Sequence, residues 1–264
     1  MTEGNAPDRP LAGRVALVTG SAQGIGAGIA QLFANHGAGV AVHGLEKDRG
    51  ENLVAVLRER GSNAILLGHD LRQESLCREL IRRVIGHYGR IDILVNNAAI
   101  FPRADLESTT VALWDEILAV NLRAPFILCQ EAAPHLKRQG GGSIINIGST
   151  CAYVGLPKVF AYSVSKGGLM TMTRNLADQL RPYRIRVNQI NPGWVRTEGE
   201  HHMQSVVEGH GEDWAEEAQR SLPSGRLLRP EDIAQAALFL ATAELITGAV
   251  LDYDQVVIGA PRDW

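Results

Sequence analysis

The stretch Arg14–Gly26, which reads RVALVTGSAQGIG, decides the fold of this chain. Residues 15–19 are mostly apolar and partly β-branched, so they predict a buried parallel strand. The glycines that follow have the spacing Gly-x-x-x-Gly-x-Gly, which permits a tight turn and a close approach of the backbone to a pyrophosphate. The next helix would then direct its N-terminus at the phosphates. A plain strand-to-helix loop stays the alternative interpretation of this turn taken alone.

Strands and helices alternate through the rest of the chain. The hydrophobic patterns predict further strands at 40–43, 64–67, 91–95, 143–147, 185–190 and 249–251. They predict helices at 25–37, 46–60, 76–88, 111–138, 161–181 and 230–241. This alternation is typical of an α/β protein. We expect a Rossmann-type doubly wound parallel sheet of about seven strands, with helices on both faces.

The length of 264 residues fits one domain. We expect that domain to span residues 12–264 and to follow a flexible N-terminal tail at 1–11. Residues 199–221 show the least regular pattern, and we expect a substrate lid at 197–222.

Composition argues against several classes of function. A net charge of −3 and a sequence pI near 6.2 give no basic surface of the kind that binds nucleic acid. No apolar run is long enough to span a membrane, and we expect no signal peptide in the polar first residues. Cys77, Cys129 and Cys151 lack metal-site or disulfide spacing, which favours free thiols in a reducing compartment, by default the cytoplasm.

Tyr162 and Lys166 stand four residues apart, a spacing that places both side chains on one face of a helix. An ammonium beside a phenol stabilises the phenolate, so we expect the pKa of Tyr162 to lie below its ordinary value of about 10. Such a group can take a proton from an alcohol or give one to a carbonyl. The spacing alone is common on helix surfaces, so its meaning depends on the motifs around it.

Further motifs stand in order on the predicted elements. They are Thr19–Gly26, Asp70 after the third strand, Asn96–Ala99 after the fourth, Asn121, Ser149, Tyr162 with Lys166, and Pro192–Thr197. On these motifs the chain resembles the short-chain dehydrogenase/reductase family over about residues 12–259. The resemblance implies an enzyme that transfers a hydride between the nicotinamide of NAD or NADP and a secondary alcohol or ketone. It also implies a homotetramer, with the helices at 111–138 and 161–181 in the main contact.

The family pattern implies four catalytic residues. Tyr162 would be the general acid or base for the reacting oxygen, and Lys166 would lower the pKa of Tyr162 and hold the nicotinamide ribose. Ser149 would hydrogen-bond the same oxygen. Asn121 would hold a water that links Lys166 to solvent.

The same pattern implies a set of cofactor-binding residues, although two of them have structural alternatives. Asn97 could simply hold the sheet together, and Thr197 could cap a helix. The set is Gly20, Ser21, Gln23, Gly24, Ile25, Gly26, Gly44, Leu45, Asp70, Leu71, Asn97, Ala98, Ala99, Tyr162, Lys166, Pro192, Gly193, Val195 and Thr197.

The end of the second strand bears on the choice between NAD and NADP. An acidic residue there binds the ribose 2′-hydroxyl and repels a 2′-phosphate, but this chain has Gly44. Gln23 and Leu45 stand where NADP-binding relatives usually have a cation. Arg49 and its neighbour Lys47 could still reach a phosphate, whereas Glu46 could reach a hydroxyl. We expect a slight preference for NAD.

The substrate pocket should lie near the catalytic residues. Its candidate residues are Ser149, Cys151, Tyr153, Tyr162, Trp194, His201 and His202, with Glu198 beside them. This mixture of polar and aromatic groups favours a sugar, a polyol or another hydroxylated small molecule. The alternatives are a 3-oxoacyl-carrier-protein reductase-like enzyme and a non-catalytic dinucleotide-binding regulatory protein. The loop histidines match no standard ligand spacing, so we expect no metal site.

Overall fold

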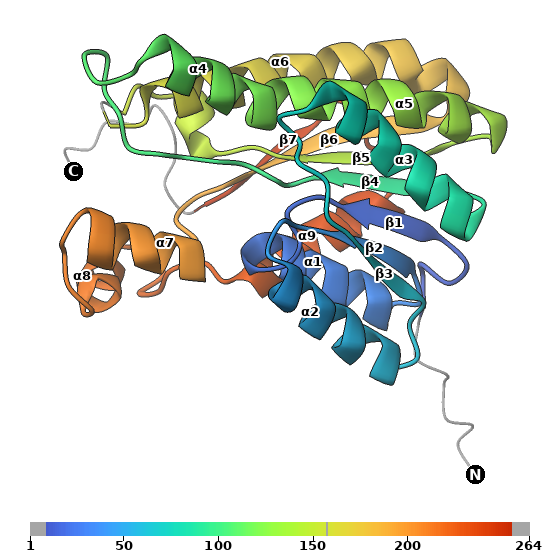
Figure 1. Cartoon of the computed structure of the whole chain (residues 1–264), viewed down its shortest axis with the longest axis horizontal. Coiled ribbons are helices and arrows are strands. Elements are labelled where there is room, and N and C mark those ends of the chain that lie inside the picture. The colour runs from blue at the N-terminus through green and yellow to red at the C-terminus, as the bar shows by residue number, and fades with distance from the viewer. Residues whose placement is uncertain (1–8, 157, 255–264) are drawn as a thin grey trace.

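Seven parallel strands form one sheet in the computed structural model, which describes residues 9–156 and 158–254 (Figure 1). The strands follow the order β3-β2-β1-β4-β5-β6-β7, and every neighbouring pair is parallel. The predicted doubly wound parallel sheet is confirmed. The strands are β1 (Val15–Val18), β2 (Gly39–His43), β3 (Ala64–Leu67), β4 (Ile93–Asn96), β5 (Gly142–Ile147), β6 (Ile185–Pro192) and β7 (Val250–Tyr253).

Helices cover both faces of the sheet (Figure 1). Side chains of β1 alternate between the two layers: Ala16 and Val18 pack on one side, whereas Val15 and Leu17 pack on the other. Both faces are therefore buried, which explains the nearly continuous apolar runs of the strands. One layer holds α1 (Gly24–Asn35), α2 (Lys47–Glu59) and α9 (Pro230–Thr242); the other holds α3 (Glu74–Tyr88), α4 (Val111–Leu118), α5 (Ala124–Arg138) and α6 (Phe160–Leu180).

The strand order reverses between β1 and β4, since β2 and β3 lie on one side of β1 and the other strands lie beyond β4. In sheets of this kind a ligand crevice opens at the carboxyl ends of the strands where the order reverses. The glycine-rich turn between β1 and α1 lies at that place. The topology thus positions the predicted dinucleotide site.

The single helix predicted at 111–138 is interrupted. Helix α4 ends at Leu118, a π-helical turn covers Ala119–Arg123, and α5 begins at Ala124. Pro125, in the first turn of α5, has no N–H for the regular helical ladder. An interruption next to a proline is therefore expected, and it places Asn121 inside the π-helical turn.

The segment predicted as an irregular lid is largely helical. It contains α7 (Glu198–His202), a π-helical turn at Met203–Val207 and α8 (Trp214–Arg220), which lie beside the main sheet in Figure 1. Trp214 and Ala215 form a small hydrophobic cluster with Leu227. These helices are too short for a periodic pattern to reveal, because seven residues or fewer span at most two turns.

The predicted boundary of the N-terminal tail needs a correction. Leu11 is fully buried in the core, and its N–H donates to the carbonyl of His36 at 3.1 Å. The folded part of the chain therefore begins before residue 12. The rest of the predicted tail, residues 1–8, lies outside the described residues.

The described residues also bear on membrane, metal and thiol chemistry. Within 9–156 and 158–254, no helix is long and apolar enough to cross a membrane. The same residues contain no group of three or more His, Cys, Asp or Glu side chains arranged to hold a metal ion. Cys77, Cys129 and Cys151 are free thiols, and burial raises the pKa of Cys129 to about 12.

Buried amides connect β4 with β5 and α6. The amide nitrogen of Asn96 donates to Oδ1 of Asn146 at 2.8 Å, and the amide nitrogen of Asn146 donates to Oγ1 of Thr173 at 2.8 Å. All three side chains are buried. Asn146 therefore bonds polar groups on both of its neighbours. Without it, the amide nitrogen of Asn96 would keep only the sulfur of Cys129, at 3.5 Å, whereas Thr173 would keep its bonds to Leu169 and Gln189.

We predict that Asn146→Leu lowers the free energy of unfolding by about 2–4 kcal/mol, because it removes two buried hydrogen bonds and leaves the amide nitrogen of Asn96 with only a sulfur partner. Urea unfolding at neutral pH measures the change. The matched control is Asn175→Leu on the exposed side of α6, for which we expect a change below about 0.5 kcal/mol. Equal losses in the two variants would contradict the assigned role of Asn146.

Candidate active site

A cavity of about 900 Å³ extends along the carboxyl ends of the central strands. Its wall includes the glycine-rich turn after β1, the ends of β2 and β4, and residues after β5 and β6. At its other end it reaches α6 and the lid helix α7. One continuous space therefore joins the predicted cofactor residues to the predicted catalytic residues.

The glycine-rich turn has a backbone that only glycine fits. Gly20 has a φ of +62°, and a Cβ atom there would lie 2.7 Å from the Cα atom of Ala98. Gly24 also has a positive φ, of +58°, and directly begins α1. A bare backbone beside a helix N-terminus is the arrangement that binds a pyrophosphate, so these residues fit a dinucleotide.

His43, at the end of β2, supports this turn from behind. The N–H of Gly20 donates to its Nδ1 at 3.0 Å, so the ring proton lies on Nε2, which donates to the carbonyl of His69 at 2.8 Å. Burial lowers the pKa of His43, which keeps the ring neutral in this role. The sequence interpretation missed this residue, although a histidine ending an apolar strand was its visible signal.

Two predicted cofactor residues shape the turn without lining the cavity. The hydroxyl of Ser21 donates to the carbonyl of Val18 at 2.7 Å and accepts from the N–H of His43 at 3.0 Å. A Cβ atom on Gly26 would lie 2.5 Å from the side-chain nitrogen of Asn97. Both positions therefore serve packing of the turn.

Asn97 holds the turn to the end of β4. Its amide nitrogen donates to the carbonyl of Thr19 at 2.8 Å and to that of Gly20 at 3.0 Å. The hydroxyl of Thr19 accepts from the N–H groups of Asn97 and Ala98. The side chain of Asn97 thus holds neighbouring segments together, which was the structural alternative considered for it. The residue also lines the cavity.

The other predicted cofactor residues all line the cavity. Thr197 does so while its hydroxyl also caps α7 by accepting the N–H of Glu200. These residues are Gly20, Gln23, Gly24, Ile25, Gly44, Leu45, Asp70, Leu71, Asn97, Ala98, Ala99, Tyr162, Lys166, Pro192, Gly193, Val195 and Thr197.

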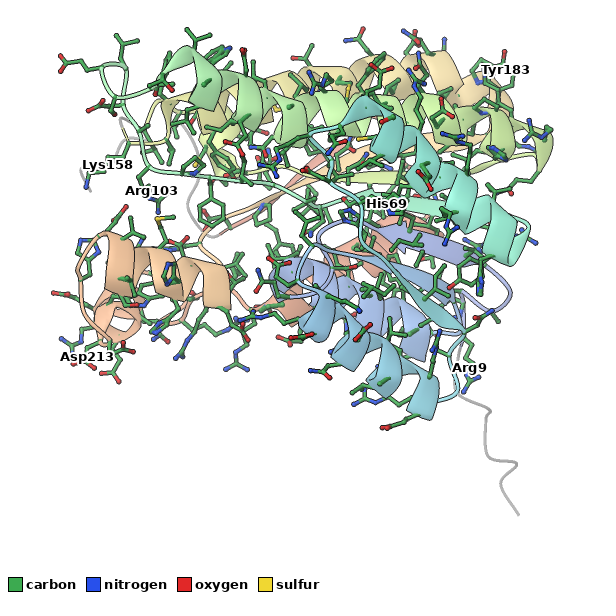
Figure 2. All side chains as sticks on the ribbon, in the orientation of Figure 1. Arg9, His69, Arg103, Lys158, Tyr183 and Asp213 are labelled. Atoms are coloured by element: carbon green, nitrogen blue, oxygen red, sulfur yellow. The ribbon has the colours of Figure 1, made fainter. Side chains whose placement is uncertain are left out.

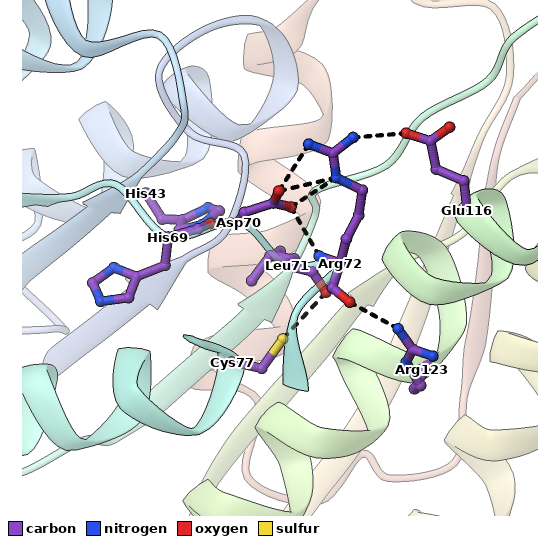
Figure 3. Close-up of polar contacts among 8 residues, drawn as sticks. All are labelled: His43, His69, Asp70, Leu71, Arg72, Cys77, Glu116 and Arg123. Atoms are coloured by element: carbon purple, nitrogen blue, oxygen red, sulfur yellow. Dashed lines mark hydrogen bonds and ion pairs between the residues drawn. The ribbon is translucent and has the colours of Figure 1, made fainter. Parts of the chain in front are cut away.

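Figure 3 shows that the carboxylate of Asp70 is held by Arg72. Both carboxylate oxygens accept from the guanidinium, which also donates to Glu116 at 2.9 Å. Hydrogen bonding to Arg72 lowers the pKa of Asp70. The backbone carbonyl of Arg72 accepts from Arg123 at 2.8 Å. The cavity wall near Asp70, a predicted cofactor residue, therefore carries a paired guanidinium that the sequence motifs did not reveal.

Arg49 of α2 lies at the rim of the cofactor end. Its guanidinium contacts Oε1 of Gln23, in the glycine-rich turn, and Oε2 of Glu198, in the lid. Glu46 lines the cavity close by. The cation nearest to the predicted ribose site is therefore paired with a carboxylate.

Tyr162 and Lys166 both face the cavity from α6. Lys166 is 2% exposed, and its ammonium donates to the carbonyl of Ile147 at 2.7 Å. Its Nζ atom lies 5.5 Å from the ring centre of Tyr162. The helical register thus brings the pair together as predicted.

The predicted electrostatic effect on Tyr162 is not present in this geometry and needs a correction. Burial is the largest influence and raises the pKa of Tyr162, while hydrogen bonding to Ser149 opposes that rise. Burial also lowers the pKa of Lys166 to about 8. Removal from water disfavours both the phenolate of Tyr162 and the ammonium of Lys166. The ammonium donates a hydrogen bond to the carbonyl of Ile147 rather than to the phenol.

Ser149 is oriented by the sheet. Its N–H donates to Oδ1 of Asn191 at 3.1 Å, and its hydroxyl accepts from the N–H of Cys151 at 3.1 Å. Asn191 also donates to Asp252 of β7 at 3.0 Å. Asp252 of β7 is therefore linked to Ser149 through a single side chain, that of Asn191.

Asn121 lies off the cavity wall. Its Oδ1 accepts from the N–H of Ile100 at 2.9 Å, and its amide nitrogen donates to the carbonyl of Ile100 at 2.9 Å and to Oγ of Ser165 at 3.1 Å. The side chain thus ties the segment after β4 to α6.

The predicted substrate residues divide into two groups. Ser149, Cys151, Tyr162 and Trp194 line the cavity, whereas Tyr153, His201 and His202 lie off its wall, as does Glu198. The hydroxyl of Tyr153 donates to Asp252 at 3.0 Å. His201 accepts from the indole nitrogen of Trp214 at 2.9 Å and faces Glu212.

Other cavity residues escaped the sequence interpretation. Phe101 and Arg103 lie between β4 and α4, and Glu200 and Gln204 belong to the lid. These residues occur in no motif of regular spacing, because loops and very short helices bring them to the wall.

The comparisons with known proteins agree with this geometry. A family model described as "Enoyl-(Acyl carrier protein) reductase" matches residues 20–255. The D-threitol dehydrogenase of Mycolicibacterium smegmatis is 37% identical over 94% of this chain and 94% of its own. A 3-oxoacyl-[acyl-carrier-protein] reductase of Thermotoga maritima is 35% identical over 92% of this chain and 97% of its own.

The fold has a solved counterpart as well. A structure from Beutenbergia cavernae, assigned as an NAD(P)-dependent gluconate 5-dehydrogenase and containing NADP at low occupancy, matches with a TM-score of 0.84 and 33% identity. The match covers 92% of this chain and 96% of that one. The chain belongs to the short-chain dehydrogenase/reductase family and is an NAD(P)-dependent oxidoreductase of that type.

Proposed function

We propose that this enzyme oxidises a secondary alcohol of a sugar, polyol or similar hydroxylated small molecule, or reduces the corresponding ketone. The observation that carries the proposal is that the glycine-rich turn and the pair Ser149 and Tyr162 line the same cavity. Ser149 and Tyr162 lie where the glycine-lined crevice opens into a pocket with Trp194, Arg103 and Glu200. A pocket of polar and aromatic groups beside an acid and base suits a compact hydroxylated substrate.

Tyr162 is proposed to exchange the proton with the substrate oxygen, and Ser149 to hold that oxygen by a hydrogen bond. The nicotinamide of a bound cofactor supplies or accepts the hydride. Because the pKa of Tyr162 is raised, its phenol is protonated at neutral pH and can donate to a carbonyl. Oxidation of an alcohol needs the phenolate and is therefore favoured by alkaline conditions.

Lys166 and Asn121 are proposed to support this exchange from behind. The ammonium of Lys166 is fixed by Ile147 and lines the same cavity, which suits a contact with the nicotinamide ribose. Asn121 is proposed as a positioning residue, since its contacts with Ile100 and Ser165 join the cavity wall to the helix that carries Tyr162.

The proposal predicts NAD(P)-dependent oxidation of D-threitol or galactose and no reduction of an acetoacetyl thioester, the substrate type of the acyl-carrier alternative. Tyr162→Phe should lower kcat on the preferred alcohol by about 10²–10⁴-fold, because the acid and base is lost. Stabilisation by the dinucleotide should persist in a thermal-shift assay. Tyr183→Phe, in the exposed turn that follows α6, is the matched control.

Thioester reduction without alcohol oxidation would reject the sugar or polyol assignment. Near-normal turnover by Tyr162→Phe would reject the role of that residue. A protein that binds the dinucleotide but turns over neither substrate type would support the regulatory alternative.

Burial of Lys166 predicts a pH-dependent cost in stability. Its pKa in the folded state is about 8, below the ordinary value of 10.5, so the buried ammonium opposes folding below pH 8. As pH rises from 8 towards 10.5, the folded state loses this proton before the unfolded state does, and the cost disappears. This lowering of the pKa of Lys166 corresponds to a free-energy cost of about 3 kcal/mol for the charged form in the folded state.

We therefore expect Lys166→Met to raise the free energy of unfolding at pH 7 by about 2 kcal/mol, after loss of the hydrogen bond to Ile147. The gain should vanish near pH 10.5. Urea unfolding at the two pH values measures it, with Lys47→Met on exposed α2 as the control. A variant that is less stable than wild type at pH 7 would contradict this account.

NAD is proposed as the preferred cofactor. Glu46 lines the cavity beyond β2, and the guanidinium of Arg49 is engaged by Glu198 and Gln23. A carboxylate in reach suits the ribose hydroxyl of NAD, whereas a 2′-phosphate would meet a cation whose charge is already balanced.

Glu198→Gln should therefore raise the kcat/KM for NADP relative to NAD by about fivefold, the equivalent of about 1 kcal/mol for an exposed charge pair. Steady-state kinetics with both cofactors measures the ratio. Glu59→Gln, which changes an exposed carboxylate at the other end of α2, should leave the ratio unchanged. An unchanged ratio in Glu198→Gln would contradict the proposal that the pairing of Arg49 with Glu198 disfavours NADP.

A homotetramer is proposed as the assembly, as in the family expectation. The helices that would make the main contact carry exposed apolar side chains. Phe126 of α5 and Phe160 and Val164 of α6 are examples. Such side chains suit an interface between copies of the chain.

A further inference from the structure

Arg103 enters the cavity from the segment between β4 and α4 and faces the lid, as Figure 2 illustrates. Its Nε atom donates to Oε1 of Glu208 at 2.6 Å, and one terminal nitrogen lies 3.6 Å from Oε1 of Glu200. The side chains of Arg103, Glu200 and Glu208 are only 21%, 15% and 14% exposed. A cation and two carboxylates are therefore gathered in a largely water-excluded position.

Glu200 is fixed by contacts that use one of its two oxygens. Its Oε1 accepts from the indole nitrogen of Trp194 at 2.9 Å and from the amide nitrogen of Gln204 at 2.8 Å. Within the described residues, every hydrogen bond and ion pair of this carboxylate uses Oε1. Likewise, the contacts of Arg103 use Nε and one terminal nitrogen. A rigid acceptor and a rigid donor thus stand side by side with hydrogen-bonding capacity in reserve.

The pair is close to the reacting centre. Both Glu200 and Arg103 influence the pKa of Tyr162, the first raising it and the second lowering it. Phe101 lies edge-on to Tyr162 at 6.2 Å, and Trp194 packs against Trp214 at 5.6 Å. Phe101 and Trp194 line the cavity, and their rings offer apolar surface to the carbon skeleton of a ligand.

Resting on the function proposed above, we propose that Arg103 and Glu200 bind two neighbouring hydroxyl groups of a neutral polyol or sugar, and that Glu208 excludes substrates bearing a carboxylate. A vicinal diol has an oxygen that can accept from the guanidinium and an O–H that can donate to the carboxylate, so it matches the pair.

Glu208 is proposed to let the pocket discriminate against negatively charged substrates. A lone arginine in a substrate pocket would bind a carboxylate. Here one guanidinium faces two carboxylates, so the group of three carries a net negative charge at neutral pH. An anionic substrate would meet repulsion from Glu200, and the charge of Arg103 that could attract it is already balanced by Glu208.

Three four-carbon alcohols test the proposal: D-threitol, 2-butanol, which has an isolated hydroxyl, and threonate, in which one end of threitol is a carboxylate. The wild-type enzyme should prefer D-threitol to both in kcat/KM. Glu200→Gln should reduce the preference for D-threitol over 2-butanol by about tenfold, since a hydrogen bond to a charged group is lost. Most of this change should appear in KM.

Glu208→Gln should make the enzyme more tolerant of a negatively charged substrate. We expect the ratio of kcat/KM for threonate to that for D-threitol to rise about tenfold, because the group formed by Arg103, Glu200 and residue 208 then loses its net negative charge. Glu212→Gln, an exposed lid carboxylate that pairs with His201, is the matched control and should leave this ratio unchanged.

A measurement on the wild-type enzyme covers the case in which a variant fails to fold. D-Threitol and erythritol should compete with 2-butanol more strongly than threonate does. Equal competition by the neutral and anionic compounds, or unchanged selectivity in folded variants, would overturn the proposal while leaving the alcohol oxidoreductase function intact. Cofactor binding without turnover of any alcohol would overturn both.

Discussion

The close approach between the turn after β1 and the residues after β4 is the constraint on which the site depends. Gly20 passes so near Ala98 that no side chain fits, and Asn97 and Thr19 hold the two segments together by hydrogen bonds. Because the strand order reverses between β1 and β4, this contact lies where the crevice opens. It therefore sets the position of the glycine-rich turn relative to the cavity wall that leads to Ser149 and Tyr162.

Burial then determines the chemistry at the other end of the crevice. Withdrawal from water raises the pKa of Tyr162 and lowers that of Lys166, because burial disfavours the charged form of each group. The surrounding core holds them there: Ile147 accepts from the ammonium, and Asn191 orients Ser149. Buried ionisable groups of this kind oppose stability locally and rely on the packed sheet for compensation.

The two ends of the cavity arise from different parts of the fold. Strand ends and the first turn of α1 make the cofactor end, where backbone geometry decides what fits. The proposed substrate end is built from the segment before α4 and from the lid, where Arg103, Glu200 and Glu208 meet. Variation in those segments can change the ligand without disturbing the sheet, since few core residues belong to them.

The sequence by itself determined the parallel sheet, the glycine-rich turn and the helical pairing of Tyr162 with Lys166, because these follow from local periodicity and spacing. Only the tertiary structure decided that Lys166 donates to Ile147, that His43 supports Gly20 and that His201 turns to Trp214. It likewise brought Arg103 to Glu200, nearly a hundred residues away. Such contacts join segments with no common period, and desolvation depends on what surrounds a group in space rather than along the chain.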